Sequence, residues 1–150
     1  TRRLPYSAEQ MYDLVADVAS YPQFLPWNSA ARIRSRRPIA GGADGPGEVL
    51  EAELVISFKV FRERFGSRVT LWPGPKKIDT EYLEGPFRHM KSHWAFRDIE
   101  GGSEVDFFVD FEFRNAILQG IIGVVFNDAM TRVVRAFERR AVELYGPKPL

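Results

Sequence analysis

The longest hydrophobic pattern in the chain runs from Asn115 to Tyr145. Its apolar residues recur at spacings of three and four, which is the period of one apolar stripe on an α-helix. Asn115 is a suitable N-cap, because its side-chain oxygen can accept a hydrogen bond from an unpaired backbone N–H. Gly146 and Pro147 end the pattern, since Gly adopts positive φ at helix ends and Pro cannot continue a helix. The pattern predicts a helix about 45 Å long, which must lie across a wide sheet.

The first half of this predicted helix contains two glycines. Gly120 and Gly123 each cost about 1 kcal/mol relative to Ala in a helix interior, and the run over residues 117–126 is apolar almost all round. Two interpretations are open. The glycines allow close packing on a neighbouring backbone, or they leave a mobile apolar half-helix that gates a cavity or touches a membrane. The run is too short to span a bilayer, which needs about 20 apolar residues.

The N-terminal part of the chain predicts a short strand and a helix. Residues 2–6 are typical of the end of a strand, and Ser7 with Gln10 forms an S-x-x-Q capping box. We expect the helix behind it to end near Ser20, because Tyr21 precedes a proline and is pushed away from helical angles.

The next segment, residues 21–28, combines two prolines with three aromatic residues. Proline cannot donate to a strand ladder, so this composition predicts an ordered, compact connection with one helical turn rather than a strand interior. Two roles are open for it. It is a hydrophobic plug that closes one end of the domain, or it is the mouth of an apolar binding site or a contact for a lipid surface. The two roles are compatible, since a plug at a cavity mouth is also a gate.

Six stretches in the middle of the chain alternate between apolar and polar side chains, which is the period of a half-buried strand. They are residues 31–38, 48–58, 62–73, 76–83, 87–99 and 103–113. The glycine-rich loop between the first two lacks the lysine of a phosphate-binding loop and predicts a turn. Short connections force neighbouring strands to be antiparallel. The order predicts one α+β domain over residues 1–150, whose curved sheet grips the C-terminal helix around a cavity.

Composition narrows the possible functions. The chain has 150 residues, of which 45% are hydrophobic, and this suits one soluble domain with a core. It has no cysteine, which removes disulfides and thiolate sites and fits a reducing compartment. The net charge of +1 excludes binding of polyanions by the bulk field. No apolar segment follows the charges at Arg2 and Arg3, so we expect no signal peptide and a cytoplasmic protein, located peripherally at the inner membrane.

Catalytic and metal-binding motifs are not evident. His89 and His93 are four residues apart on a predicted strand, so they share a face but lie about 13 Å apart and cannot hold one ion together. Asp106 and Asp110 have the same separation, which does not suit paired-carboxylate chemistry. We therefore predict no catalytic residue, no metal and no cofactor, and a protein that is not an enzyme. The enzymatic alternative is a cyclase or hydrolase that uses one buried acid.

Arginines concentrate on the first of the six strands, at Arg32, Arg34, Arg36 and Arg37. Alternation predicts that the first three point to the same face. They form either a solvated outer face or a contact with anions such as phospholipid head groups or ribosomal RNA, because the guanidinium group pairs well with phosphate. Aromatic side chains are not interleaved with these arginines, which weakens the nucleic-acid interpretation.

Three segments resemble a known family. They are Tyr21-Pro22-Gln23-Phe24-Leu25-Pro26-Trp27, then Glu84-Gly85-Pro86-Phe87-Arg88-His89-Met90 with Trp94-Ala95-Phe96, and Phe137-Glu138-Arg139-Arg140-Ala141 with Leu144-Tyr145-Gly146. Together they resemble the coenzyme Q-binding proteins of the START-like, polyketide cyclase-type group, which also includes bacterial ribosome-association toxins. Members often carry Cys after the Trp, whereas Asn28 stands at that position here.

The resemblance implies a helix-grip fold, with a curved antiparallel sheet of six to seven strands wrapped on the long C-terminal helix. It implies non-enzymatic binding and delivery of ubiquinone or a similar isoprenoid lipid in support of respiration. The alternative is a regulator that binds the large ribosomal subunit. The residues expected to line the cavity and its mouth are Tyr21, Phe24, Leu25, Trp27, Leu54, Ile56, Phe58, Met90, Trp94, Phe96, Phe107, Val109, Phe111, Ile122, Val125, Phe126, Ala129 and Val133. The candidate hydrogen-bond donors to a quinone carbonyl are Trp94, Tyr82, Ser92 and Trp27.

Overall fold

The computed structural model describes residues 2–43, 45–58 and 61–147. In chain order the elements are β1 (Arg2–Leu4), α1 (Ala8–Ala16), the 3-10 helix η1 (Val18–Gln23), β2 (Asn28–Ala40), β3 (Pro46–Phe58), β4 (Phe61–Trp72), β5 (Lys77–Glu84), β6 (Phe87–Ile99), β7 (Gly102–Phe113) and α2 (Ala116–Tyr145). The predicted α+β class, the antiparallel sheet and the long C-terminal helix are confirmed.

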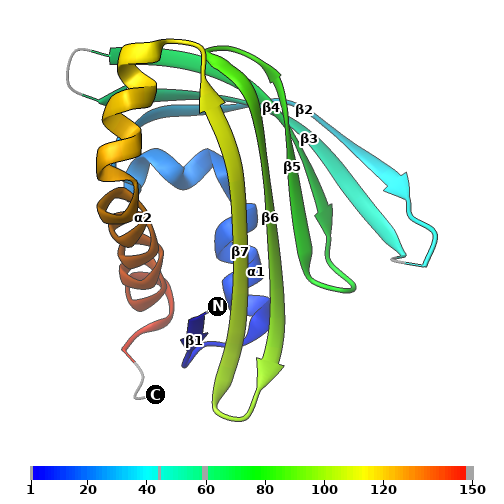
Figure 1. Ribbon diagram of the computed structural model, residues 1–150. Coiled ribbons are helices and arrows are strands. Elements are labelled where there is room, and N and C mark those ends of the chain that lie inside the picture. The colour runs from blue at the N-terminus through cyan, green and yellow to red at the C-terminus, as the bar shows by residue number, and fades with distance from the viewer. Residues whose placement is uncertain (1, 44, 59–60, 148–150) are drawn as a thin grey trace.

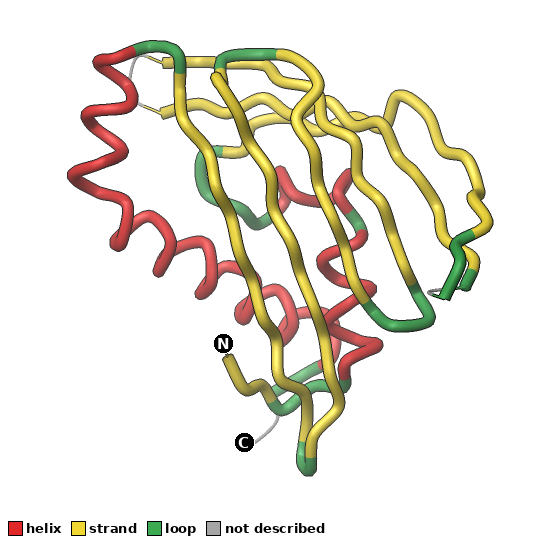
Figure 2. The backbone as a smooth tube through the Cα atoms, turned by 45° about the vertical axis from the view of Figure 1, so that its right-hand side comes forward, coloured by secondary structure: helices red, strands yellow, loops and turns green. Residues whose placement is uncertain are grey.

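The seven strands form one antiparallel sheet in the order β1-β7-β6-β5-β4-β3-β2. Strands β2 to β7 each pair with their neighbour in the chain, and β1 joins the edge beside β7. The sheet curves, and α2 lies across its concave side together with α1 and η1 (Figure 1). A view turned by 45° shows the helices on the same side of the sheet, with its other side uncovered (Figure 2).

The alternation of apolar and polar residues sets which side chains face the helices. Directly paired residues share a face of the sheet. Trp94 on β6 pairs with Ile78 on β5 and with Phe107 on β7, which forms an apolar row on the concave side. The neighbouring row contains Thr80 and Ser92. Trp94 and Phe107 therefore face the cavity side of the sheet, as predicted.

The entry into α1 follows the predicted capping box. Ser7 Oγ accepts from the backbone N–H of Gln10 at 3.1 Å, and Gln10 Oε1 accepts from the N–H of Ser7 at 3.0 Å. The predicted end near Ser20 is wrong, because α1 stops at Ala16. The chain continues as η1, which accommodates a proline, and Tyr21 Oη donates to the carbonyl of Val15 at 2.5 Å.

The strand β2 does not keep the regular alternation that its arginines predict. Its register with β3 shifts between Ile33 and Ser35, where the β-bulge places one extra residue. After the bulge, Arg36 lies opposite Leu50, whose side chain is fully buried on the concave side. The prediction that Arg32, Arg34 and Arg36 share one face is therefore wrong for Arg36. The strand is also longer than predicted at both ends.

The boundaries of α2 match the prediction. Asn115 Oδ1 accepts from the backbone N–H groups of Ile117 and Leu118 at 2.9 and 3.0 Å. At the other end Gly146 has φ of 82°, which favours glycine, and its N–H donates to the carbonyl of Val142. The two polar caps define where the helix begins and ends.

The helix α2 is held at its two ends by separate hydrophobic clusters. Leu118 in its first turn packs with Phe65, Phe87 and Phe113. Near its C-terminus, Ala136, Phe137 and Ala141 are buried, and Phe137 and Ala141 belong to the main core with α1 and the sheet. Between these ends, over residues 119–135, no side chain is fully buried. The middle of the helix therefore spans the concave face without filling it.

The glycines of α2 are not explained by close packing. A Cβ atom added at Gly120 or Gly123 would meet no atom within 4 Å. The first interpretation of these glycines, close approach to another backbone, is therefore wrong. They weaken the helix without a steric need.

Replacing these glycines should stabilise the fold. We expect Gly120→Ala and Gly123→Ala each to raise the free energy of unfolding by about 0.4–1 kcal/mol, because Ala restricts the unfolded chain and favours the helix. Urea denaturation measures the change. Gly102→Ala is the control with the opposite sign, since its Cβ would lie 1.8 Å from the backbone oxygen of Leu4. A loss of stability at Gly120 would contradict the open environment.

Candidate ligand-binding site

A cavity of about 340 Å³ lies between the concave face of the sheet and the middle of α2. It is bounded at one end by η1 and the turn that follows it. Most of the residues expected to line the cavity do so, namely Tyr21, Leu25, Trp27, Leu54, Ile56, Met90, Trp94, Phe107, Val109, Phe111, Ile122, Phe126, Ala129 and Val133. They come from five elements and the turn before β2, so the fold brings together residues that are distant in sequence.

Four of the expected residues do not line this cavity. Phe24 packs edge-on against Tyr21 and Phe137 and lies under the guanidinium of Arg140, 5.3 Å from its carbon. Phe96 is 4% exposed and belongs to the main core. Val125 lines a smaller neighbouring pocket, and the side chain of Phe58 lies outside the described part of the structure.

The sequence reasoning missed several residues that line the cavity. They are Val18, Asn28, Phe65, Ser67, Val69, Ile78, Thr80, Phe87, Ser92, Phe113, Met130 and Phe137. The sequence predicted Ser92 only as a hydrogen-bond donor to a quinone carbonyl. Two-residue periodicity could have found Ser67 and Thr80, because each lies two residues along its strand from an inward apolar residue. Phe137 and Met130 continue the apolar stripe of α2.

The described lining of the cavity is uncharged. None of the described residues that line it is Asp, Glu, Lys, Arg or His. Its polar groups are those of Asn28, Ser67, Thr80, Ser92 and Tyr21, together with the indole N–H groups. Burying an unpaired charge is very costly, so this cavity suits a neutral ligand with few polar atoms.

The one phenol of the cavity is already engaged. Tyr21 Oη donates to the carbonyl of Val15, and burial, followed by the nearby carboxylate of Asp17, raises the pKa of Tyr21 well above its ordinary value. The group therefore stays neutral at physiological pH. Among the described lining residues there is no general acid or base near neutrality.

Two aromatic rings form part of the cavity wall. The rings of Trp94 and Phe107 lie with centroids 4.2 Å apart, and Phe137 meets the Trp94 ring edge-on at 5.3 Å. A flat ligand ring can stack on such a surface. Of the four proposed donors, Trp27, Ser92 and Trp94 line the cavity, whereas Tyr82 does not. Tyr82 Oη instead accepts from the N–H of Phe87 at 3.2 Å.

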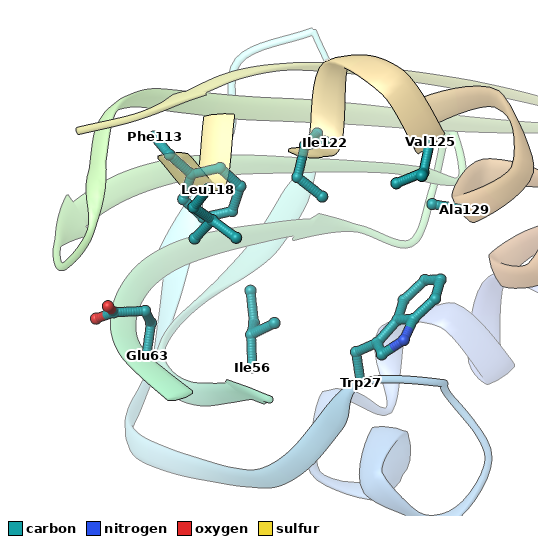
Figure 3. Close-up of a pocket in the computed structure, with 8 residues that line it drawn as sticks. All are labelled: Trp27, Ile56, Glu63, Phe113, Leu118, Ile122, Val125 and Ala129. Carbon is teal, nitrogen blue, oxygen red and sulfur yellow. The ribbon is translucent and has the colours of Figure 1, made fainter. Parts of the chain in front are cut away.

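A smaller pocket of about 60 Å³, which we call the mouth pocket, adjoins the main cavity beside the first half of α2. It shares Trp27, Ile56, Phe113, Ile122 and Ala129 with the main cavity, and Glu63 also lines it. In Figure 3 the indole of Trp27 faces Val125 and Ala129 across this pocket.

The backbone at Trp27 is unusual. Trp27 has φ of 63°, a conformation that bulky residues rarely adopt, and its carbonyl accepts from the N–H of Ser57 at 2.7 Å. Such strained positions cost about 1–3 kcal/mol and cluster at ligand sites. The strained residue therefore lines both the mouth pocket and the main cavity.

The arginines of β2 are largely paired with carboxylates on the convex side of the sheet. Glu53 is 13% exposed and accepts from Arg32 and Arg34 at 3.1 and 2.8 Å, with Arg64 3.3 Å away. Arg34 also pairs with Glu84, and Gly66 leaves the space for this contact. These pairs remove most of the free positive charge.

The remaining arginines of the cluster differ from these. Arg36 pairs with Glu48 at 2.8 Å. Arg37 is exposed, and it forms no ion pair with any residue that the structure describes. The surface of β2 therefore offers much less unpaired positive charge than the sequence suggests.

The two histidines lie on the convex face, as predicted. His89 Nε2 is 3.2 Å from Asp110 Oδ1, and His93 Nδ1 is 2.5 Å from Asp79 Oδ1. Over residues 2–43, 45–58 and 61–147, no group of three or more His, Asp or Glu side chains could hold a metal ion. Each histidine is a partner in a surface pair, separate from the cavity.

The sheet, the long helix and the apolar cavity define a class of binding domain, and sequence comparison gives the family. Residues 4–138 match the family described as polyketide cyclase / dehydrase and lipid transport, and the chain belongs to this family. The chain is 42% identical to the ribosome association toxin RatA of Rickettsia prowazekii, over 96% of this chain and 94% of that protein. It is 31% identical to the coenzyme Q-binding protein COQ10 homolog B of Xenopus laevis, over 95% of this chain and 57% of that protein.

Solved structures show the same fold. The 18 kDa protein CC1736 from Caulobacter crescentus is 32% identical with a TM-score of 0.77, covering 97% of this chain and 95% of that one. A START superfamily protein from Mycobacterium smegmatis is 20% identical with a TM-score of 0.75, covering 95% and 94%. The predicted START-like helix-grip fold is confirmed.

The convex ion pairs predict a pH dependence of stability. The hydrogen bond from Arg34, followed by that from Arg32, holds the pKa of Glu53 below its ordinary value. Because this pKa is lower in the folded than in the unfolded chain, the pairs stabilise the fold at neutral pH. This stabilisation is lost as the pH falls from the ordinary glutamate range, about 4.3, through the lowered pKa.

We expect the free energy of unfolding of the wild type to fall more steeply on acidification than that of Glu53→Gln. Urea denaturation across the acidic range measures both profiles. Glu81→Gln is the control, since Glu81 is largely exposed and lies 3.8 Å from Arg68. Loss of such an exposed ion pair should change the free energy of unfolding little at neutral pH. Parallel profiles for the wild type and Glu53→Gln would show that these pairs do not contribute.

Proposed function

We propose that this protein binds and delivers a neutral isoprenoid lipid, and that ubiquinone is the best-fitting candidate. The observation that carries the proposal is the uncharged apolar cavity, about 340 Å³, with a few neutral hydrogen-bonding groups in its wall. Cavities of this size enclose small ligands. A quinone ring with a hydrocarbon tail matches this lining, whereas a fatty acid or phospholipid would bury an unpaired charge.

The ligand would gain binding energy from both of its parts. Each buried CH₂ group contributes about 0.8 kcal/mol, so one or two isoprene units in the cavity give appreciable affinity. The ring stacks beside Trp94 and Phe107. The lipid-transport description of the family, and the relative that is named for coenzyme Q binding, support this proposal.

A carrier fits the site better than an enzyme does. The family description includes cyclases and dehydrases, but the two relatives above are not named as enzymes. Acid–base catalysis needs a titratable group within reach of the substrate. The described lining residues supply only the phenol of Tyr21, whose raised pKa keeps it neutral. The ligand is therefore carried unchanged.

The first half of α2 is the part that we propose contacts a membrane surface during loading. Ile117 and Val124 are 71% and 86% exposed on its outer side. An 18-residue stretch of α2 has the length and composition of a membrane-spanning helix, and 6% of it is buried. Since both ends of α2 pack on the fold, contact in the plane of the interface suits it better than spanning. The protein would then act peripherally, at the cytoplasmic face of the inner membrane.

Ribosome association is the second candidate function. The observation that favours it is the 42% identity to a ribosome association toxin. The pairing of Arg32, Arg34 and Arg36 with carboxylates argues against a broad RNA contact through β2. Arg37 is the arginine of this strand that could meet phosphate without breaking an ion pair seen in the described residues.

A larger side chain in the mouth pocket should weaken ligand binding. Ala129 lines both the mouth pocket and the cavity, so Ala129→Phe is expected to weaken binding of a short-chain ubiquinone at least about tenfold, or about 1.4 kcal/mol. Quenching of tryptophan emission reports binding, because Trp27 and Trp94 line the cavity. Val124→Phe introduces the same ring on the exposed side of the helix and should leave binding unchanged. Absence of quenching in the wild type, with no quinone extracted from the purified protein, would refute the carrier.

The ribosome hypothesis makes a separate prediction. If β2 contacts RNA, the protein should co-sediment with large ribosomal subunits at low salt and be released as salt is raised, because phosphate contacts depend steeply on ionic strength. Arg37→Ala should reduce the bound fraction, with Arg97→Ala as a control on β6, which is separated from β2 by three strands. Failure to co-sediment at low salt would remove this candidate.

A further inference from the structure

Three hydroxyl side chains form a small polar patch inside the otherwise apolar cavity. They are Ser67 on β4, Thr80 on β5 and Ser92 on β6, and all three line the cavity. We propose that this hydroxyl patch recognises the oxygen atoms of the ligand's head group and orients the ligand with its head inward. The inference rests on the carrier function proposed above and adds the group that gives it specificity.

The register of the sheet places the three residues together. Thr80 and Ser92 are directly paired across β5 and β6. Val69 is the partner of Thr80 on β4, and Ser67 lies two residues further along that strand, which makes Ser67 and Thr80 diagonal neighbours. Directly paired Cβ atoms lie about 4.5–5.5 Å apart, and diagonal neighbours about 7–8 Å. The patch is therefore about the size of one substituted ring.

The hydroxyl groups of the patch have unused hydrogen-bonding capacity. Within the part of the chain that the structure describes, none of the three forms a hydrogen bond, whereas the hydroxyls of Ser7 and Ser20 do. Ser67 is 2% exposed, and like Thr80 and Ser92 it lines the cavity. The molecule that these hydroxyl groups can bind is therefore one that lies inside the cavity. A ligand that brings oxygen atoms to the patch supplies the missing hydrogen-bond partners.

The surroundings restrict the chemistry of the head group. The patch is bordered, in the same row or in adjacent rows of the sheet, by Val69, Trp94 and Val109. Among the described residues, no cationic side chain lines the cavity. A phosphate or carboxylate head would thus lack a counter-charge. A hydroxyl can donate to a carbonyl or accept from another hydroxyl. The patch therefore suits a neutral ring with carbonyl or hydroxyl oxygens, and it accepts both the quinone and the quinol form.

The position of the patch also sets the direction of the ligand. None of its three residues lines the small pocket at the mouth, which is bordered by Trp27 and by Val125 and Ala129 of α2. The patch sits on the central strands β4, β5 and β6 of the sheet, whereas the mouth pocket is lined by Trp27 and by Ile56 near the end of β3. A head group on the patch leaves its apolar tail to run between the sheet and α2 toward the mouth.

The test compares a ligand that has a polar head with one that has none. Displacement of one apolar fluorescent dye gives the affinities of a short-chain ubiquinone and of squalene, an isoprenoid hydrocarbon. We expect Thr80→Val and Ser92→Ala each to weaken ubiquinone binding about three- to tenfold, and addition of Ser67→Ala to weaken it further. Squalene binding should change less than about twofold. Ser103→Ala is the matched control, because Ser103 is equally buried but lies outside the cavity.

The possible outcomes distinguish a failure of the patch hypothesis from a failure of the carrier hypothesis. A wild type that binds neither ligand refutes the carrier. If the wild type and the variants bind ubiquinone with the same affinity, the patch does not recognise the head group, although the carrier function is still supported. This result is expected if the hydroxyl groups only bind water. Equal weakening for both ligands, or a comparable loss in Ser103→Ala, would assign the hydroxyls a structural role and also overturn the inference.

Discussion

The cavity exists because one long helix is anchored at two places that are far apart. The cluster around Leu118 fixes its first turn, and the main core around Phe137 and Ala141 fixes its last turns. Further polar contacts hold both ends. Phe113 donates its N–H to Gln119 Oε1 at 2.9 Å, and Tyr145 Oη donates to the carbonyl of Gln10 at 2.9 Å. A curved sheet cannot follow a straight helix over about 45 Å, so the middle of the helix stands off from it.

Charge and polarity are divided between the two faces of the sheet. On the convex face, Arg34 reaches Glu53 on β3 and Glu84 on β5 across Gly66 on β4, so its ion pairs join β2, β3 and β5. On the concave face the cavity has no charged group among the described lining residues. This division lets the sheet satisfy its ionic groups in water while it offers a neutral interior. The preference for an uncharged ligand that we propose would follow from the same alternation that builds the strands.

Local signals in the sequence predicted the parts of the fold that depend on local physics. Asn115, Gly146 and the Ser7–Gln10 box set helix ends through hydrogen bonds between near neighbours. The bulge at Arg34 could not be predicted, because it depends on the pairing of β2 with β3.

Contacts between elements that are distant in sequence also explain why the site was predicted only in part. Phe96 faces inward like its neighbours, but α1 covers it, with Tyr12 edge-on against its ring. The hydroxyl patch arises from the register of three strands, and hydrophobic periodicity carries no information about register between strands.

The glycines of α2 connect this architecture to the ligand exchange that the proposed carrier function requires. Local opening costs least where few apolar side chains are buried. The first half of α2 has one fully buried residue, Leu118, whereas the second half has Ala136, Phe137 and Ala141. Gly120 and Gly123 lower the helix propensity of the same half without any packing requirement. Opening there would widen the mouth while the C-terminal anchor and the central strands stay intact. The half of the helix that is held most weakly is thus the half through which an apolar guest would pass.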